Sequence, residues 1–94
     1  MDVKIVVPDM LVGTSEIKVA KWYKKPGDYI KFDELLLELE TENYQEIENG
    51  FITGVLLEIN APIEGVLKFT KKVGKIVKTG QVVGKIRESH ERLS

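Results

Sequence analysis

The chain has 94 residues, 43% of them apolar, and its 14 basic and 15 acidic residues leave a net charge of −1, which gives no electrostatic reason to expect nucleic acid. The absence of cysteine excludes a disulfide framework, a thiolate zinc site and a thiol nucleophile, and the single histidine, His90, excludes a multi-histidine metal site. Because no apolar run approaches the roughly 20 residues that cross a bilayer, and no secretory signal opens the chain, we expect a cytoplasmic protein without membrane contact.

Apolar residues come in short runs and alternations and not at helical spacing, which predicts strands at 3–7, 17–22, 35–39, 55–59, 66–69, 76–77 and 82–86. Turn-forming residues separate these runs: Pro26-Gly27-Asp28, Asn49-Gly50, Pro62-Ile63-Glu64-Gly65, Val73-Gly74 and Thr79-Gly80. We predict one all-β domain over residues 1–87. A polar tail or linker start follows at 88–94, where His90 is given no role.

The sequence also repeats itself after 47 residues. The shift places turn glycine on turn glycine and apolar residue on apolar residue: Gly27 on Gly74, Ile30 on Val77, Leu36 on Val83, Leu39 on Ile86, and Val19 and Trp22 on Val66 and Phe69. This predicts a quasi-twofold sandwich in which each half contributes one sheet's worth of core, with chance similarity among short strands as the alternative. For Trp22 we expect core or half-buried packing, and a role on a binding surface is the alternative.

Six segments, at 7–10, 13–17, 19–30, 33–42, 57–67 and 80–86, follow one another in an order typical of one family. Their most characteristic pieces are Val7-Pro8-Asp9-Met10, Lys25-Pro26-Gly27-Asp28, Glu40-Thr41-Glu42 and Ala61-Pro62-x-x-Gly65. The chain resembles the lipoyl and biotinyl carrier domains, most of all the N-terminal lipoyl domain of 2-oxo acid dehydrogenase acyltransferases. The resemblance implies a flattened β-sandwich, or barrel-sandwich hybrid, of two quasi-twofold-related four-stranded sheets, with the termini at one end and a protruding hairpin at the other.

The family's chemistry depends on one lysine at the hairpin tip, normally after Glu-Thr-Asp, whose amine forms an amide with lipoic acid on a tight, exposed turn. The matching run here is Glu40-Thr41-Glu42-Asn43, so Asn43 occupies the lysine position and its carboxamide is not a nucleophile under these conditions. No lysine or arginine lies anywhere from 32 to 67, so this conclusion does not depend on the alignment, and the Met-Lys-Met tip of biotinyl domains is absent too. We therefore expect no bound cofactor, although lipoate is the family's cofactor.

The hairpin is also longer than the resemblance implies, by a segment at 44–54. Its middle, residues 47–52, carries an Asn-Gly pair between apolar residues, which favours a two-residue type I′ turn. We predict a hairpin extended over about 40–59. The alternative places the insertion later, because residues 54–59 also match the family's strand after the tip.

The extended hairpin is the candidate interaction site, with these residues: Glu40, Glu42, Asn43, Tyr44, Ile47, Phe51 and Ile52. Its apolar residues and strand edges would be exposed unless the ribbon folds back on its own domain or a protein partner covers it, self-pairing through the edge being one form of the latter. Residues 32–67 hold nine acids and no base, whereas the other 58 residues hold 14 bases and six acids. A partner here should therefore be basic or apolar and bind in a salt-sensitive way.

We interpret the chain as a non-catalytic lipoyl-like module that acts through protein contacts, with a 2-oxo acid dehydrogenase-type complex as one setting. One alternative is a genuine carrier modified on another lysine, such as Lys24, Lys25, Lys71 or Lys72. An enzyme would have to use the alternating carboxylates of Glu38, Glu40 and Glu42 for acid-base work or cation binding. No phosphate loop or base accompanies them, so a solvated acidic face is expected and no enzymatic activity is predicted.

Overall fold

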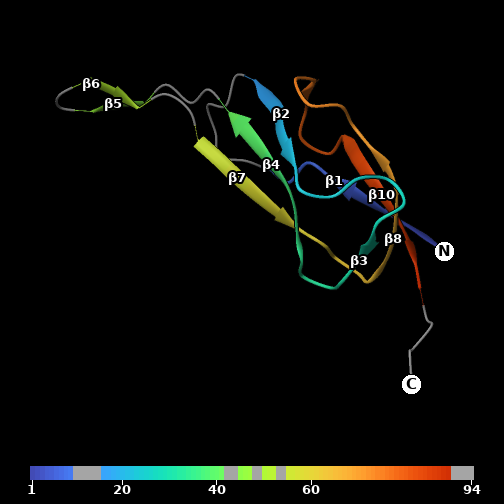
Figure 1. Ribbon diagram of the computed structural model, residues 1–94. Helices are drawn as coiled ribbons and strands as arrows, with labels where there is room; N and C mark the ends of the chain where they lie inside the picture. Colours follow the sequence, from blue (N-terminus) through green and yellow to red (C-terminus); the bar gives the residue numbers. More distant parts are fainter. Residues whose placement is uncertain (10–15, 42–44, 48–49, 53–54, 90–94) are drawn as a thin grey trace.

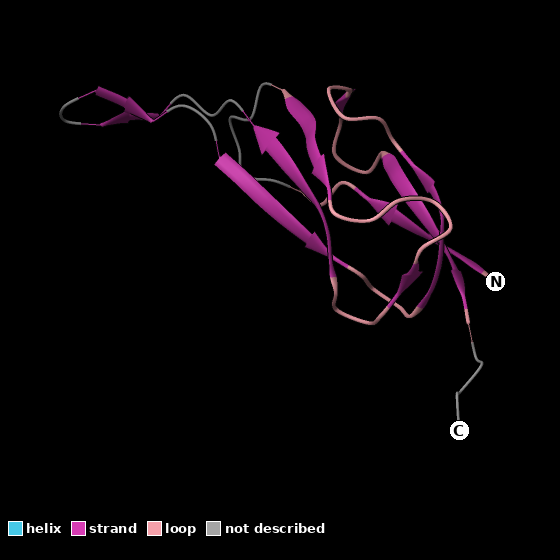
Figure 2. Cartoon of the chain, viewed as in Figure 1, coloured by secondary structure: helices cyan, strands magenta, loops and turns pink. Residues whose placement is uncertain are grey.

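The computed structural model describes residues 1–9, 16–41, 45–47, 50–52 and 55–89, and all regular secondary structure within them is β (Figure 1). Figure 2 shows the same residues as strands and connecting loops only. In this part of the chain there is no helix that could cross a membrane. The prediction of an all-β fold is confirmed.

Each of the predicted apolar runs forms a strand. In chain order the strands are β1 (Asp2–Val6), β2 (Ile17–Trp22), β3 (Tyr29–Ile30), β4 (Leu35–Thr41), β5 (Gln45–Ile47), β6 (Gly50–Ile52), β7 (Val55–Asn60), β8 (Gly65–Thr70), β9 (Ile76–Val77) and β10 (Val82–Glu88). β10 thus continues to Glu88, and the next amide, of Ser89, donates to the Glu64 carbonyl at 3.2 Å.

Two four-stranded antiparallel sheets form the sandwich, with strand orders β1-β10-β8-β3 and β7-β4-β2-β9. The flattened β-sandwich is therefore confirmed. The halves of the chain do not, however, build one sheet each. Each half supplies two strands to each sheet: β1 and β3 of the first half flank β10 and β8, and β7 and β9 of the second half flank β4 and β2. This exchange ties the two halves together at both edges.

The internal repeat is visible in the backbone. A shift of 47 residues converts β3 into β9 and β4 into β10. Gly27 and Gly74 have positive φ angles of 98° and 92°, and so do Asp33 and Gly80, at 67° and 83°. Chance similarity among strands would not reproduce such paired left-handed positions, because residues other than glycine rarely adopt them.

In the segments that precede the glycine turns, equivalent residues of the two halves are 48 and not 47 positions apart. Two matching hydrogen bonds of 2.7 Å establish it: the Tyr23 amide donates to the Leu36 carbonyl, and the Lys71 amide donates to the Val83 carbonyl. The predicted matches of Val19 with Val66 and of Trp22 with Phe69 are therefore wrong by one residue, and fully buried Val19 corresponds to fully buried Leu67. The reason is that the segment between strand and glycine has one residue more in the first half than in the second.

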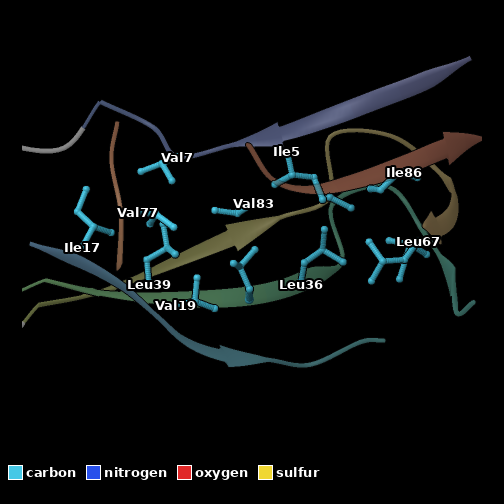
Figure 3. Packing of buried hydrophobic residues seen from close by; sticks show 13 residues of the cluster. Ile5, Val7, Ile17, Val19, Leu36, Leu39, Leu67, Val77, Val83 and Ile86 are labelled. Carbon is cyan, nitrogen blue, oxygen red and sulfur yellow. The ribbon is translucent and has the colours of Figure 1, made fainter. Parts of the chain in front are cut away.

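The core lies between the two sheets, where side chains from both halves meet (Figure 3). Its members are Ile5, Val7, Ile17, Val19, Ile30, Leu36, Leu37, Leu39, Ala61, Leu67, Val77, Val83 and Ile86. Trp22 packs against this cluster while half-buried, and its indole Nε1 donates to the Lys71 carbonyl at 2.7 Å. The expected packing role of Trp22 is confirmed.

We expect Leu39→Ala to lower the free energy of unfolding by about 2–5 kcal/mol, because it removes a fully buried side chain and leaves a cavity. Leu56→Ala is the matched control: Leu56 is 60% exposed on the neighbouring strand, and its truncation should change stability by no more than about 0.5 kcal/mol. Chemical denaturation of both variants measures the difference. Equal losses would contradict the assignment of the core.

Candidate functional site

The hairpin that would carry the family's lysine leaves the sandwich between β4 and β7. These strands pair from Leu35 and Asn60 up to Thr41 and Val55, so residues 42–54 connect the last pair of the ladder. Within that connection β5 and β6 form a separate two-stranded sheet. Figure 1 shows this ribbon beyond the sandwich, at the end opposite the N-terminus and the end of β10. The extra ribbon thus comes before Val55, and 55–60 belong to the sandwich.

The register of β5 against β6 differs from the one that a two-residue Asn49-Gly50 turn requires, and Asn49 itself lies outside the described residues. Ile47 pairs with Gly50, so the two residues between the paired strands are 48 and 49 and not the Asn49-Gly50 pair. Gly50 is therefore the first residue of β6. Glycine is favoured at the last position of a four-residue turn as well as at its centre, so an Asn-Gly pair alone leaves the register open by one residue.

The structure distributes the predicted interaction residues over β4, β5 and β6, and leaves three of them undescribed. Glu40 is exposed on β4, whereas Ile47 lies in β5 and Phe51 and Ile52 lie in β6. Glu42, Asn43 and Tyr44 fall outside the described residues. The contacts expected of this hairpin remain a prediction.

The outer face of the β7-β4-β2-β9 sheet continues the acidic character of the hairpin. Leu37, Leu39 and Thr41 are buried, so the alternating Glu38 and Glu40 point outward, as predicted from their spacing. Across the ladder from them stand two residues of β7 that sequence reasoning did not single out as part of the site: Glu58 pairs with Glu38, and Leu56 pairs with Glu40. The alternation of residues 55–60 was the signal that could have identified them.

Two lysines border this acidic face on β2. Lys18 pairs with Glu40, and Lys21 pairs with Glu38. The Lys21 ammonium lies 4.5 Å from the centre of the Tyr23 ring, a cation–π distance. The Tyr23 hydroxyl donates to Glu38, and this hydrogen bond raises the pKa of the tyrosine. The face therefore changes from acidic on β7 and β4 to basic on β2.

Thr41, at the base of the hairpin, is 2% exposed, and its Oγ1 has no hydrogen-bond partner among the residues that the structure describes. A buried hydroxyl without a partner destabilises the fold, because it loses its hydrogen bonds to water and gains none within the protein. We expect Thr41→Val to raise the free energy of unfolding by about 1 kcal/mol, because the shape is kept and the hydroxyl is removed. Thr41→Ser keeps the hydroxyl, removes the methyl group and should destabilise. Thermal and urea unfolding of the pair measure both effects, and a destabilised Val variant would show that the hydroxyl is satisfied.

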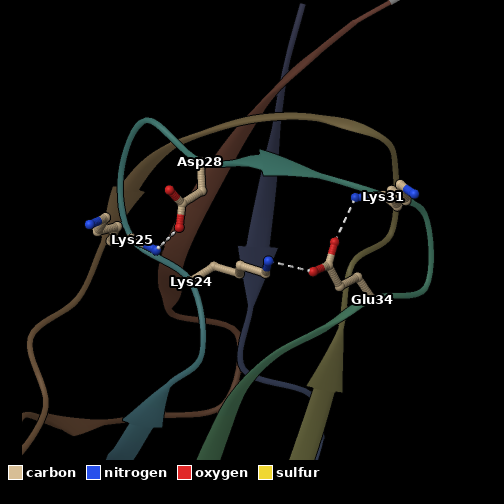
Figure 4. A network of polar contacts seen from close by, with 5 residues as sticks. All are labelled: Lys24, Lys25, Asp28, Lys31 and Glu34. Carbon is tan, nitrogen blue, oxygen red and sulfur yellow. Dashed lines mark hydrogen bonds and ion pairs between the residues drawn. The ribbon is translucent and has the colours of Figure 1, made fainter.

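The lysines of the alternative carrier hypothesis lie away from the hairpin, on the loops after β2 and β8. Figure 4 shows Lys24 pointing toward Glu34, with Nζ and Oε2 2.8 Å apart. The second oxygen of Glu34 accepts from the Lys31 amide at 2.9 Å. The hydrogen bond with Lys24 lowers the pKa of Glu34 and raises that of Lys24. Lys24 is thus a charged partner in an ion pair, on a different turn from the one the family uses.

Lys25 belongs to the adjacent turn. Its backbone amide donates to the Asp28 carboxylate at 2.9 Å, and the Asp28 amide donates back to the Lys25 carbonyl at 3.0 Å. These two bonds, together with the positive φ of Gly27, give a closed turn in which the carboxylate satisfies the backbone.

Comparison with known proteins agrees with this geometry. The family model described as "Biotin-requiring enzyme", that of the biotinyl and lipoyl domains, matches residues 3–86. The chain is 45% identical over 89 residues to the dihydrolipoyllysine-residue succinyltransferase component of the 2-oxoglutarate dehydrogenase complex of Rickettsia felis, which covers 94% of the chain and 20% of the relative. The component of the same name from Escherichia coli K12 is 35% identical over 89 residues, covering 94% of the chain and 19% of the relative. The chain therefore spans about a fifth of the length of these curated relatives. By the match over 3–86 and by its two-sheet fold, this chain belongs to the biotinyl/lipoyl domain family and is related to the acyltransferase components of 2-oxo acid dehydrogenase complexes.

Proposed function

We propose that the chain is a lipoyl-like domain that carries no lipoyl or biotinyl group and works through protein contacts. The main support for this proposal is that no lysine or arginine occurs from 32 to 67. The last residue pair of the β4–β7 ladder, Thr41 and Val55, lies inside that interval. Every residue that the turn beyond this ladder can present therefore lacks an amine. A swinging arm attached by an amide has no acceptor there, and the domain itself would perform no catalysis.

The contacts would be made by the hairpin and by the acidic face beside it. Glu40 and Glu58 are exposed on that face together with Leu56, and 60% of Leu56 is accessible. A surface of carboxylates around an apolar residue suits a partner that presents lysine or arginine around an apolar contact. Because the relatives are components of a 2-oxoglutarate dehydrogenase complex, we place the partner in a cytoplasmic assembly of the 2-oxo acid dehydrogenase type.

The modification half of the proposal is tested by intact-mass measurement. The purified chain is incubated with lipoate ligase, lipoate and ATP, and separately with biotin ligase, biotin and ATP, beside a lysine-bearing lipoyl domain as positive control. The mass should stay unchanged. A stoichiometric adduct, located by peptide mapping to Lys24, Lys25, Lys71 or Lys72, would overturn the proposal and establish the carrier alternative.

The binding half is tested with purified components of a 2-oxo acid dehydrogenase complex from the same organism. We expect association that weakens as salt rises and that is lost in a Glu40→Lys/Glu58→Lys variant. Asp2→Lys/Glu64→Lys, which reverses two exposed acids outside this face, is the matched control. If neither salt nor the Glu40→Lys/Glu58→Lys substitution weakens binding, the result would contradict an interface on the acidic face.

A further inference from the structure

A second feature lies away from the hairpin, on the loops that follow β2 and β8. Each half of the chain carries a Lys-Lys pair shortly before its turn glycine: Lys24-Lys25 before Gly27, and Lys71-Lys72 before Gly74. The hydrogen bond from the Trp22 indole to the Lys71 carbonyl joins the two loops directly. Together residues 22–26, 28 and 70–73 line an open hollow of about 550 Å³, which we call the lysine hollow.

The charges of the lysine hollow are not balanced. Four lysines and one acid, Asp28, line it. Lys24 is neutralised by Glu34 at 2.8 Å. Among the residues that the structure describes, no carboxylate lies within ion-pair distance of the other three ammonium groups, those of Lys25, Lys71 and Lys72. The repeat has therefore brought surplus positive charge to one place, and such a surface attracts an anionic ligand.

The residues that line the lysine hollow indicate which kind of anion it can bind. Apolar surface alternates with the lysines, since Val73 is 60% exposed and Tyr23 39% exposed beside half-buried Trp22. No arginine lines the hollow, so it lacks the planar fork that binds a phosphate group at two points. Ammonium groups on flexible stems, spread over two loops, match several carboxylates spread along a chain better than one compact anion.

We propose that the lysine hollow binds an extended, acidic peptide segment of a partner, with carboxylates on the lysines and apolar side chains against Trp22 and Val73. This site is separate from the hairpin. β2 runs from Ile17, paired with Thr41 at the hairpin base, to Trp22 at the hollow, which is a length of about 17 Å at 3.3 Å per residue. The hollow thus lies at the end of β2 that is farther from the hairpin base.

Trp22 is the only tryptophan of the chain and serves as the reporter. The full chain is titrated with an acetylated hexapeptide that alternates Glu and Leu, and the emission of Trp22 is followed at low and at physiological salt. We expect a saturable change whose midpoint moves to higher peptide concentration as salt rises. The same peptide with Gln in place of Glu should give no saturable change.

A pair of charge-reversal variants locates the site. Lys25→Glu/Lys72→Glu changes two exposed residues of the hollow and should weaken binding about tenfold. Lys75→Glu/Lys78→Glu makes the same change of net charge at two exposed lysines outside the hollow and should shift the midpoint less than about twofold. Matching thermal unfolding midpoints of the two variants establish that both fold.

Three results would overturn the proposal: no saturable emission change, equal weakening by both variants, or equal binding of the Gln peptide. Competition experiments with other anions test which class of anion the hollow binds. Displacement of the peptide by inorganic phosphate or by a single-stranded oligonucleotide at comparable concentration would show that the hollow selects charge and not an acidic peptide.

Discussion

Replacement of residues 42–54 by the dipeptide Asp-Lys is expected to turn this chain into a lipoate acceptor. The register supports the design, because Thr41 and Val55 already face each other at the end of the β4–β7 ladder, and two residues suffice to connect such a pair in a tight hairpin. The result would read Glu40-Thr41-Asp-Lys-Val55, the run that the family resemblance associates with acylation. Incubation with lipoate ligase, lipoate and ATP should then give a stoichiometric adduct by intact mass.

The matched variant is Asn43→Lys in the full-length hairpin. It supplies an amine at the aligned position but keeps the thirteen-residue connection between Thr41 and Val55. If the ligase recognises the tight turn as well as the lysine, this variant should be modified far less than the shortened one. Equal modification of the two would show that the missing amine alone separates this chain from a carrier. Failure of the shortened variant, folded by circular dichroism, would show that the ligase reads surface beyond the turn.

Strand positions and the sandwich were predictable because buried apolar alternation marks strands, and every predicted run from 3–7 to 82–86 forms one. The repeat was predictable from its glycines, since Gly27 and Gly74 both need a left-handed backbone. The exchange of β3 and β9 between sheets was not predictable, because the sequence of a two-residue strand does not indicate which strand it pairs with. The change of the repeat from 47 to 48 residues between β2 and β8 was not predictable for a related reason. A loop can contain one more residue without changing the apolar pattern on either side.

The candidate site was predictable only as far as it rests on residue types. The acid-rich, lysine-free interval from 32 to 67 needs no structure. The neighbours Leu56 and Glu58 depend on the register of β7 against β4, and the lysine hollow depends on the contact between Trp22 and Lys71, 49 residues apart. Pairings of this kind arise from tertiary packing, which local patterns do not encode.

Gly65→Ala is expected to be among the most destabilising single changes in the domain. The sequence suggests a turn glycine after Ala61-Pro62, but Gly65 is the buried first residue of β8, and its φ is not among the positive ones. A Cβ built there would lie 2.0 Å from the Arg87 carbonyl oxygen, so β10 would have to move away from β8. We expect a loss of about 4 kcal/mol or more, measured by urea unfolding.

Gly27→Ala separates the two reasons for which a glycine can be required. Gly27 has a φ of 98°, and apart from its chain neighbours no described residue lies within 4 Å of the place that an added methyl group would take, so alanine there meets backbone strain of about 1–2 kcal/mol. A domain of this size has about 5–14 kcal/mol of stability in total. It should therefore tolerate the loss at Gly27, whereas the loss at Gly65 would remove most of the stability if the total lies at the lower end of this range. Similar losses for the two variants would mean that β8 and β10 can separate locally, and that Gly65 serves the turn and not the packing of the sheet.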